Sequence, residues 1–403
     1  MDYDIVFVGG GMVGATIGCA RGTTPLRVAV VESTVAQTEW PEEDFDIRVS
    51  AITRATQRVF AAVGAWGGMV GRRVCAYSHM HVWDATGSGE IDFDAADIGE
   101  PDLGLIVENR VILAALLERM AQFDNIELLC PAKVRELQRS DEGVTLTLED
   151  DRALTAKLIV GADGANSWVR EQARIDTTGW AYDQTAVVAT IKTSKHHQDT
   201  CWQRFMPTGP LAFLPLPGGY SSIVWSTTPE RAAELVAMEE GPFLDALQLA
   251  FGDKLGRMES TGPRGAFPLV LRHANRYTDT RLVLTGNAAH AIHPLAGQGL
   301  NLGVSDVAAL VEVLLEAHAD KQDIGDMAVL RRYERWRKAD NVAVMAAMDG
   351  FKRLFSNDNG LLKLVRNIGM SLADKAGPAK NLMIRRAMGL SGDLPKLSRG
   401  LDL

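Results

Sequence analysis

This chain of 403 residues has few cysteines, no long apolar run and no excess of positive charge. Its four cysteines, Cys19, Cys75, Cys130 and Cys201, are scattered and form no C-x-x-C pair. This usage is typical of a reducing compartment rather than of a disulfide framework or a zinc site. No run of about eighteen apolar residues occurs, which argues against a transmembrane helix. The net charge of −9 argues against nucleic acid as a general partner.

The chain also lacks the features of an exported protein or a metalloprotein. Its first apolar run begins by residue 5, so we expect no signal peptide and a cytoplasmic protein, peripheral if it contacts the inner membrane. His290 and His293 lie close together, but no carboxylate or cysteine completes a ligand set, so we predict no metal. A chain of this length favours two domains.

The opening segment contains a nucleotide-binding pattern. The apolar run Ile5–Val8 leads into G-x-G-x-x-G from Gly9 to Gly14, a helical pattern follows, and a second apolar run ends at Glu32. This order is a βαβ unit with an acid at the position that contacts a ribose diol. The first glycine allows the tight turn, Gly11 admits a pyrophosphate, and the third lets helix and sheet approach closely. The pattern predicts an adenine dinucleotide, with a glycine-rich turn in an ordinary α/β domain as the alternative.

Two further glycine-rich turns follow apolar runs later in the chain. Asp163 lies in a G-A-D-G turn at the end of an expected strand, where ligands gather in open α/β sheets. Its simpler interpretation is the capping of a helix over 166–174. The third turn follows a strand at 281–286 and runs into a helix over 304–317. A glycine-rich loop before a helix N-terminus predicts an anion site.

The region 185–271 differs, because short alternating runs are separated there by frequent turn residues. These runs predict a largely antiparallel sheet with a helix at 242–250, inserted as a substrate domain. Hairpins are expected at 80–93 and 136–148, and residues 106–110 are expected to open a helix that continues to 122. The aromatic residues of the region are candidates for an apolar pocket, although plain core is the commoner role. These aromatics are Trp202, Phe205, Phe213 and Trp225.

Taken together, the three motifs resemble one known family. The sequence is similar to the class A flavoprotein aromatic monooxygenases, which share the fold of para-hydroxybenzoate hydroxylase, and among them to the ubiquinone-biosynthesis hydroxylases. The matching segments are Gly9–Gly14 with Glu32, Gly161–Ser167, Gly286–His290 and Pro294–Gly303, with Glu108–Arg110, Met388-Gly389 and Gly392–Pro395 for the ubiquinone branch. The resemblance covers almost the full chain and is weakest over 185–270.

The resemblance implies an α/β fold with three components. These are a Rossmann-like FAD-binding domain, an inserted and mostly antiparallel β-sheet substrate domain, and a C-terminal helical segment. The expected FAD-binding parts are 1–75, 101–180 and 273–345, the substrate strands are 76–100, the substrate domain is 181–272, and the basic helical segment is 346–403.

The resemblance also implies a reaction. FAD is expected to stay bound, with NAD(P)H as a transient electron donor and O₂ as co-substrate. A single full dinucleotide fingerprint agrees with one resident nucleotide. The implied product is a polyprenyl phenol hydroxylated on its ring in ubiquinone biosynthesis, through a flavin C4a-hydroperoxide. Two alternatives stay open: a hydroxylase of a soluble phenol, and a non-catalytic flavin-bound scaffold in a biosynthetic complex.

FAD contacts are expected from all three motifs and from two arginines. The expected residues are Gly9, Gly11, Met12, Val13, Gly14, Glu32, Ser33, Arg48, Arg110, Val134, Asp163, Gly164, Asn287, Pro294, Gly297, Gly299, Leu300 and Asn301. Most of the family has aspartate where this chain has Asn287, but the amide keeps an acceptor oxygen, so we expect FAD still to bind. The expected substrate pocket contains Phe213, Pro215 and Pro294. His290 is a candidate proton relay, with capping or packing as the favoured alternative.

The C-terminal residues 350–403 reverse the charge of the rest of the chain. They hold ten Lys and Arg against four Asp, a net charge of +6. Leucines and other apolar residues between 361 and 372 recur near helical spacing among these basic residues. A basic amphipathic segment predicts contact with anionic lipid, which suits a polyprenylated substrate. A helix that packs on its own domain is the equally weighted alternative.

Overall fold

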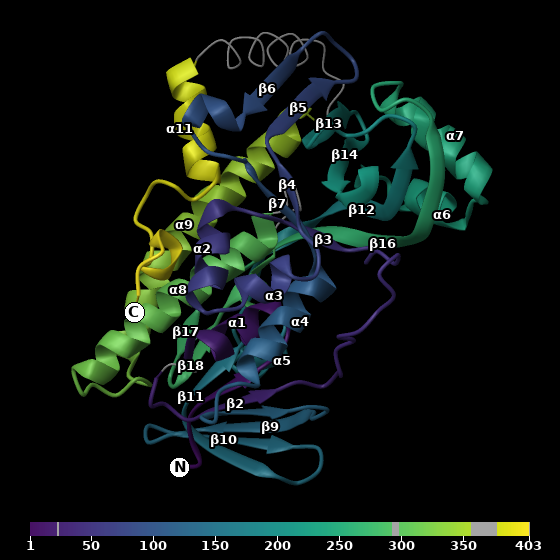
Figure 1. Cartoon of the computed structure of the whole chain (residues 1–403). Coiled ribbons are helices and arrows are strands. Elements are labelled where there is room, and N and C mark those ends of the chain that lie inside the picture. The colour runs from purple at the N-terminus through teal and green to yellow at the C-terminus, as the bar shows by residue number, and fades with distance from the viewer. Residues whose placement is uncertain (22–23, 292–297, 356–376, 403) are drawn as a thin grey trace.

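The computed structural model describes residues 1–21, 24–291, 298–355 and 377–402. Within this part of the chain a mainly parallel sheet fills the lower half of Figure 1, and an antiparallel sheet lies at its upper right. The long helices α8 (Gln298–Ala319) and α9 (Met327–Phe355) run beside them. This arrangement agrees with the expected α/β fold.

The first sheet contains the nucleotide-binding pattern. Its strands run parallel in the order β18-β11-β1-β2-β8. Their bounds are Leu282–Leu284, Ala153–Gly161, Tyr3–Val8, Val28–Val31 and Ile126–Leu129. The strands β17 (Thr278–Asp279), β10 (Val144–Leu148) and β9 (Val134–Arg139) extend the sheet in antiparallel fashion. Helices α1 (Met12–Arg21), α4 (Asn109–Met120) and α8 share its core, and the buried strand residues Ile5–Val8 and Val28–Val31 are accordingly continuous apolar runs.

The second sheet has the order β19-β16-β12-β15-β14-β13-β5-β6. Its strands in that order are His290–Ala291, Met258–Ala274, Thr177–Thr193, Tyr220–Thr227, Gly209–Leu216, Thr200–Met206, His79–Asp84 and Glu90–Asp94. Neighbouring strands are antiparallel except β13 and β5, which are parallel. The expected antiparallel sheet and the hairpin at 80–93 are therefore confirmed.

The two faces of this second sheet are covered differently. Helices α6 (Pro229–Ala237) and α7 (Glu240–Phe251) cover one side, which we call the helix face, where Val187, Phe213 and Phe251 form a closed core. Because side chains alternate along a strand, Leu214 and Leu216 point to the opposite face. There they join residues of the first half of the chain in a separate apolar cluster.

A small sheet of order β3-β7-β4 lies between the two large ones (Figure 1). Its strands are Val49–Ile52, Gly104–Glu108 and Cys75–Tyr77, and the short helices around it are α2 (Arg54–Ala62), α3 (Trp66–Val70) and η1 (Ala95–Ile98). The expectation that residues 106–108 open a helix is wrong. All five residues of β7 are buried between two antiparallel partners, and the helix begins only at Asn109.

The described C-terminal residues pack back on the rest of the protein. Helix α9 runs without a break across the expected boundary at residue 345. Helix α11 (Gly377–Ala387) buries Ile384 against η1. The tail then returns past α2 to η5 (Leu397–Arg399), where the Lys396 backbone N–H donates to Glu312 at 2.8 Å. The apolar repeat expected between 361 and 372 lies outside the described residues.

None of the helices in the described ranges combines the length and the apolar character that crossing a bilayer requires.

Candidate functional site

All three glycine-rich motifs meet at one edge of the parallel sheet. The strands that precede them, β1, β11 and β18, are neighbours and point the same way, so their carboxyl ends lie together. Backbone hydrogen bonds continue past the strands: Ala162 N–H donates to Val8 O at 2.8 Å, and Thr285 N–H to Gly161 O at 3.0 Å. The sequence separates these motifs by more than a hundred residues, and the sheet order brings them into one site.

The glycines of the first motif have different structural roles. A Cβ on Gly9, whose φ is +103°, would lie 2.4 Å from Ala162 O, and a Cβ on Gly14 would lie 1.9 Å from Gly9 O. These two positions exclude any side chain. Gly11 is different, because a Cβ there would meet no atom within 4 Å. Open space beside a glycine at the N-terminus of α1 fits the pyrophosphate of a dinucleotide such as FAD.

Glu32 closes the first motif from the end of β2. Its Oε2 accepts the Gly10 N–H at 2.7 Å, and its Oε1 accepts the Thr34 N–H at 2.8 Å and the hydroxyl of Ser33 at 3.2 Å. These bonds hold the carboxylate against the glycine turn. It is therefore in position to accept hydrogen bonds from a ribose, and Ser33 contributes by orienting it.

The second motif places Asp163 at the start of a short helix, α5 (Trp168–Gln172). Its carboxylate accepts the Ser167 hydroxyl at 2.5 Å and the Val169 N–H at 3.0 Å, so the capping interpretation holds. Burial raises the pKa of Asp163 despite these bonds. Beside it, Gly164 has φ +83° and open space where a Cβ would stand. The turn can thus cap its helix and still expose backbone to a ligand.

The third motif begins with the turn η3 (Gly286–Ala288), which we call the flavin turn. A Cβ on Gly286 would lie 3.1 Å from Val13 Cγ2, and one on Gly303 would lie 2.9 Å from the same atom, so the turn and α8 both pack on α1. Asn287 is exposed at the tip of the turn. Gly299 is open to a ligand, whereas Pro294 and Gly297 lie outside the described residues.

Several expected FAD contacts are occupied by protein partners. Asn301 is 5% exposed, and its amide joins the Ala51 carbonyl at 2.8 Å to the Thr56 hydroxyl at 2.7 Å. Met12, Leu300 and Val134 are half-buried against the main core. The side chains of these residues therefore pack or bond within the protein.

The two expected arginines lie on different elements, because Arg48 directly precedes β3 and Arg110 lies in the first turn of α4. The guanidinium of Arg110 stacks over Trp40 at 4.5 Å, and its Nε donates to Glu108 at 3.0 Å. Glu108 is 1% exposed and also pairs with Arg73 at 2.6 Å. Arg48 is exposed and lies 5.2 Å from the ring of Phe267, on the second sheet. Arg48 is therefore the freer of the two to meet a cofactor between the sheets.

His290 is buried and bound to the protein. Its Nε2 lies 2.5 Å from Asp306 Oδ2, the residue is 2% exposed, and Nδ1 has no hydrogen-bond partner among the residues that the structure describes. Asp306, on α8, also bonds to Arg337 on α9 at 3.0 Å. A fixed, enclosed imidazole favours the packing interpretation over a proton relay. None of the sequence motifs pointed to Asp306 or Arg337.

The two expected substrate residues that the structure describes, Phe213 and Pro215, lie on the helix face of the second sheet, and Pro294 lies outside the described residues. Phe213 is fully buried on the helix face, with its ring 4.1 Å from that of Phe251, which favours the core interpretation. Pro215 shares that face by strand alternation. The opposite face presents Leu214 instead. Alternation within β14 could have found this residue once one buried neighbour was known.

Cys75, His197 and Asp199 are the described side chains that come nearest to a metal set, with donor atoms within 4.8 Å of one another. Both imidazole nitrogens are already used: Nε2 bonds to Leu216 O at 2.9 Å, and Nδ1 accepts the Asp199 N–H at 3.1 Å. Burial also raises the pKa of Cys75 to about 11, so its thiol stays protonated. The geometry does not favour a metal here.

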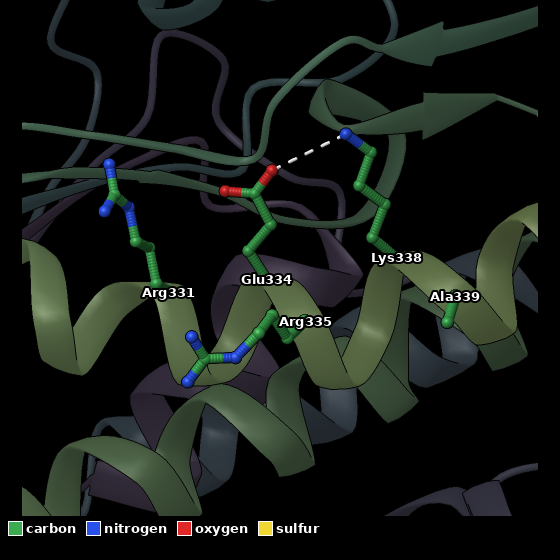
Figure 2. A pocket seen from close by; sticks show the side chains of 5 residues that line it. All are labelled: Arg331, Glu334, Arg335, Lys338 and Ala339. Carbon is green, nitrogen blue, oxygen red and sulfur yellow. Dashed lines mark ion pairs between the residues drawn. The ribbon is translucent and has the colours of Figure 1, made fainter.

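Helix α9 also lines an open groove of about 460 Å³, shown in Figure 2. Its lining residues are Arg331, Glu334, Arg335, Lys338 and Ala339. Glu334 pairs with Lys338 at 3.6 Å and accepts the Thr278 hydroxyl at 2.5 Å, while Arg331 and Arg335 extend from the helix in different directions. None of the motif residues lines this groove, so it does not belong to the site.

Comparison with known proteins agrees with this geometry. Residues 2–347 match a family model described as an FAD binding domain. The chain is 39% identical to the ubiquinone hydroxylase UbiL of Rhodospirillum rubrum, covering 99% of this chain and 93% of that protein. It is 36% identical to the 3-demethoxyubiquinol 3-hydroxylase of Escherichia coli, covering 96% and 98%. The crystal structure of p-nitrophenol 4-monooxygenase PnpA from Pseudomonas putida has a TM-score of 0.79 at 19% identity, covering 96% and 97%, which shows a shared fold.

Proposed function

We propose a reaction from one premise: the chain belongs to the FAD-dependent aromatic monooxygenases, and among them to the ubiquinone-biosynthesis hydroxylases. The proposed reaction hydroxylates the ring of a polyprenyl phenol on the pathway to ubiquinone. NAD(P)H supplies two electrons, and one atom of O₂ becomes the ring hydroxyl while the other leaves as water. Bound FAD supplies the redox chemistry.

The convergence of the three motifs is the observation that carries this proposal. Gly11, Gly164 and Gly299 leave open space at the edge where three parallel strands end. The opposite face of the second sheet is apolar near this edge. A cofactor bound along the edge would have polar backbone on one side and an apolar wall on the other, as ring hydroxylation in the absence of bulk water requires.

The residues of the chain bind and orient in this proposal. The N-terminus of α1 offers backbone N–H groups to the pyrophosphate, and Glu32 accepts from the ribose. The N-terminus of α8, together with the flavin turn, would face the ring system and favour negative charge there. Leu214 and its neighbours exclude water from the substrate side. No acid–base side chain is assigned a proton.

A membrane contact through α11 would supply the polyprenyl substrate. Ile384 and Met388 are buried, whereas Leu382 and Met383 are 63% and 56% exposed on the other side of the helix, beside exposed Arg386. Large apolar side chains next to a cation match the interface of an anionic bilayer. We infer that α11 and the residues before it hold the protein peripherally on the inner membrane, where a ubiquinone-biosynthesis complex would also assemble.

Rapid mixing of the reduced protein with O₂ tests the reaction. The FAD-loaded protein is reduced anaerobically with NADPH or NADH and mixed with O₂, with and without a prenylated phenol. A transient absorbance that differs from oxidised and reduced flavin, and decays faster with the phenol, supports the proposal. Faster decay with a soluble phenol alone would favour that alternative. Bound FAD with no O₂ consumption under any donor and phenol would favour the scaffold.

Vesicle pelleting tests the membrane contact separately. Leu382→Asp with Met383→Asp should abolish pelleting with vesicles that contain phosphatidylglycerol. The matched control is Leu249→Asp, because Leu249 is 86% exposed on α7, a surface with no proposed contact. Equal pelleting of the α11 variant and the control would contradict the proposed surface.

A further inference from the structure

We propose that Asp306 is a positioning residue that links the flavin turn to helix α9. Helix α9 extends this linkage to the face of the second sheet opposite α6 and α7, which we call the substrate face. The proposal rests on FAD occupying the site, and it does not depend on which phenol is hydroxylated. Three features support it. Both carboxylate oxygens of Asp306 accept hydrogen bonds in the interior, two of the donors lie in or next to the flavin turn, and one side of α9 contacts both large sheets.

The carboxylate of Asp306 accepts from four donors. Its Oδ2 takes the Gly286 N–H at 3.2 Å and bonds to His290 Nε2 at 2.5 Å. Its Oδ1 takes Arg337 Nε at 3.0 Å and Asn341 Nδ2 at 3.1 Å. Asp306 and Asn341 are 0% exposed, and Arg337 is 3% exposed. A carboxylate with both oxygens saturated in a dry interior has one stable orientation.

The four donors belong to two different parts of the fold. Gly286 opens the flavin turn and His290 follows it, so they bracket the exposed Asn287. Arg337 and Asn341 both lie on α9. The carboxylate, on α8, is therefore the junction of turn and helix. Burial alone would raise the pKa of Asp306, but His290 and Arg337 outweigh it and lower the pKa, so the carboxylate stays charged.

The same stripe of α9 continues to the second sheet. Tyr333 donates to Leu284 O, the last residue of β18, at 3.0 Å. Arg337 and Asn341 follow at intervals of one turn, and the next turns bring Met345 and Met348 onto the same side of the helix. Met345 packs with Leu269 and Leu271, and Met348 packs beside Val82 and Phe205, all on the face opposite α6 and α7.

Helix α9 contacts Asp306 at one part of this side and the second sheet at another, so a displacement at one contact can reach the other. A ligand that moves Met345 or Met348 on the substrate face would shift α9, and the saturated carboxylate would carry that shift to Gly286 and His290. A purely structural Asp306 would instead stabilise the fold without linking the two ends. The linkage predicts that changes at the methionines alter FAD binding and that this effect requires Asp306.

The experiment measures FAD affinity of the apoprotein by quenching of flavin fluorescence, together with thermal unfolding of the same samples. Asp306→Asn should weaken FAD on the order of 10-fold or more, because it keeps the shape but leaves buried donors unpaired. Asp323→Asn is the control, since Asp323 also binds an arginine, Arg281 at 2.6 Å, but not the turn. It should leave FAD affinity unchanged.

Two further variants separate linkage from folding. Met345→Ala with Met348→Ala should weaken FAD by roughly threefold to tenfold in the parent and by much less in the Asp306→Asn background. If Asp306→Asn does not fold, Asn341→Ala, which removes only one of the four donors, takes its place in the cycle. Additive effects, or lower thermal stability with unchanged FAD affinity, would overturn the linkage. Failure of the hydroxylase reaction would leave this measurement unaffected, because no turnover is involved.

Discussion

The two large sheets build the site in opposite ways. In the parallel sheet the expected functional groups are, apart from the Glu32 carboxylate, backbone atoms: N–H groups at helix starts, and glycines such as Gly9 and Gly14 that leave no room for a side chain. In the antiparallel sheet the groups are side chains, and alternation decides whether a residue lies on the helix face or on the opposite face. We therefore expect cofactor binding to depend on glycines that carry no side chain. We expect substrate binding to depend on which side chains are present and on which face of the sheet they lie.

This difference sets the tolerance of each region to change. A methyl group added at Gly9 or Gly14 meets backbone, which cannot move without breaking the sheet. A methyl group added or removed on the substrate face meets other side chains, which can repack. The cofactor edge is expected to be intolerant and the substrate face adjustable.

The largest expected effect is that of Gly14→Ala. Its Cβ would lie 1.9 Å from Gly9 O, so the helix must move off the sheet. We expect a cost of about 3 kcal/mol or more, and roughly a hundredfold loss of FAD affinity where the turn is displaced. Gly241→Ala on α7, where a Cβ meets nothing within 4 Å, should be neutral or stabilising by up to about 1 kcal/mol. Calorimetric titration of FAD into both apoproteins checks this, and equal affinities would break the comparison.

The cofactor edge could be predicted from sequence because its signals are local. Strand, glycine turn, helix and acid follow one another from Ile5 to Glu32, and each acts through backbone geometry that a few neighbouring residues determine. The family resemblance then predicted that the three motifs belong to one FAD-binding domain, and the structure supplied the sheet order that joins β1, β11 and β18. The capping role of Asp163 was also available, because a helix follows it at once.

The remainder depends on contacts between distant residues. The face on which Phe213 lies requires the register of β14 against β13 and β15, which no short segment contains. Residues 106–108 look like the start of a helix until two partner strands bury them. Asp306 lies among mostly apolar residues in a long helical pattern, and this apolar surrounding is the only sequence signal that the acid is buried. Its four partners are 16 to 35 residues away.

A second, smaller effect should separate the two faces of the antiparallel sheet. Phe213→Ala should destabilise the protein by about 3 to 5 kcal/mol, because the ring is fully buried on the helix face. Its KM for the phenol should not change at temperatures where the variant is folded. Leu214→Ala should cost much less stability and raise KM several-fold. Urea unfolding and steady-state kinetics of both variants decide the matter, and a raised KM for Phe213→Ala alone would restore its predicted place in the pocket.

The smallest expected effect concerns pH at the junction of the two sheets. His273, on β16, is half-buried and bonds to Tyr277 OH at 3.0 Å, with His290, Lys338 and Glu334 nearby. Burial, followed by His290, lowers the pKa of His273 to about 4. In the unfolded chain an imidazole titrates near pH ~6.5, so between these values only the unfolded state binds the proton. Stability should therefore fall as the pH drops from about 6.5 to about 4.

Solvent screening at a half-exposed imidazole reduces the expected loss to about 1 kcal/mol. His273→Gln keeps a hydrogen bond to Tyr277 but does not titrate, so its free energy of unfolding should lack this decline. Urea unfolding of the apoproteins at several pH values between these limits measures the difference, with His318→Gln, exposed at the end of α8, as the control. If His273→Gln keeps the full decline, the acid sensitivity belongs to other groups. His273 would then not make the contact between the two large sheets sensitive to acid. The contrast between the parallel sheet, built on backbone groups, and the antiparallel sheet, built on side chains, would not extend to the residues that join them.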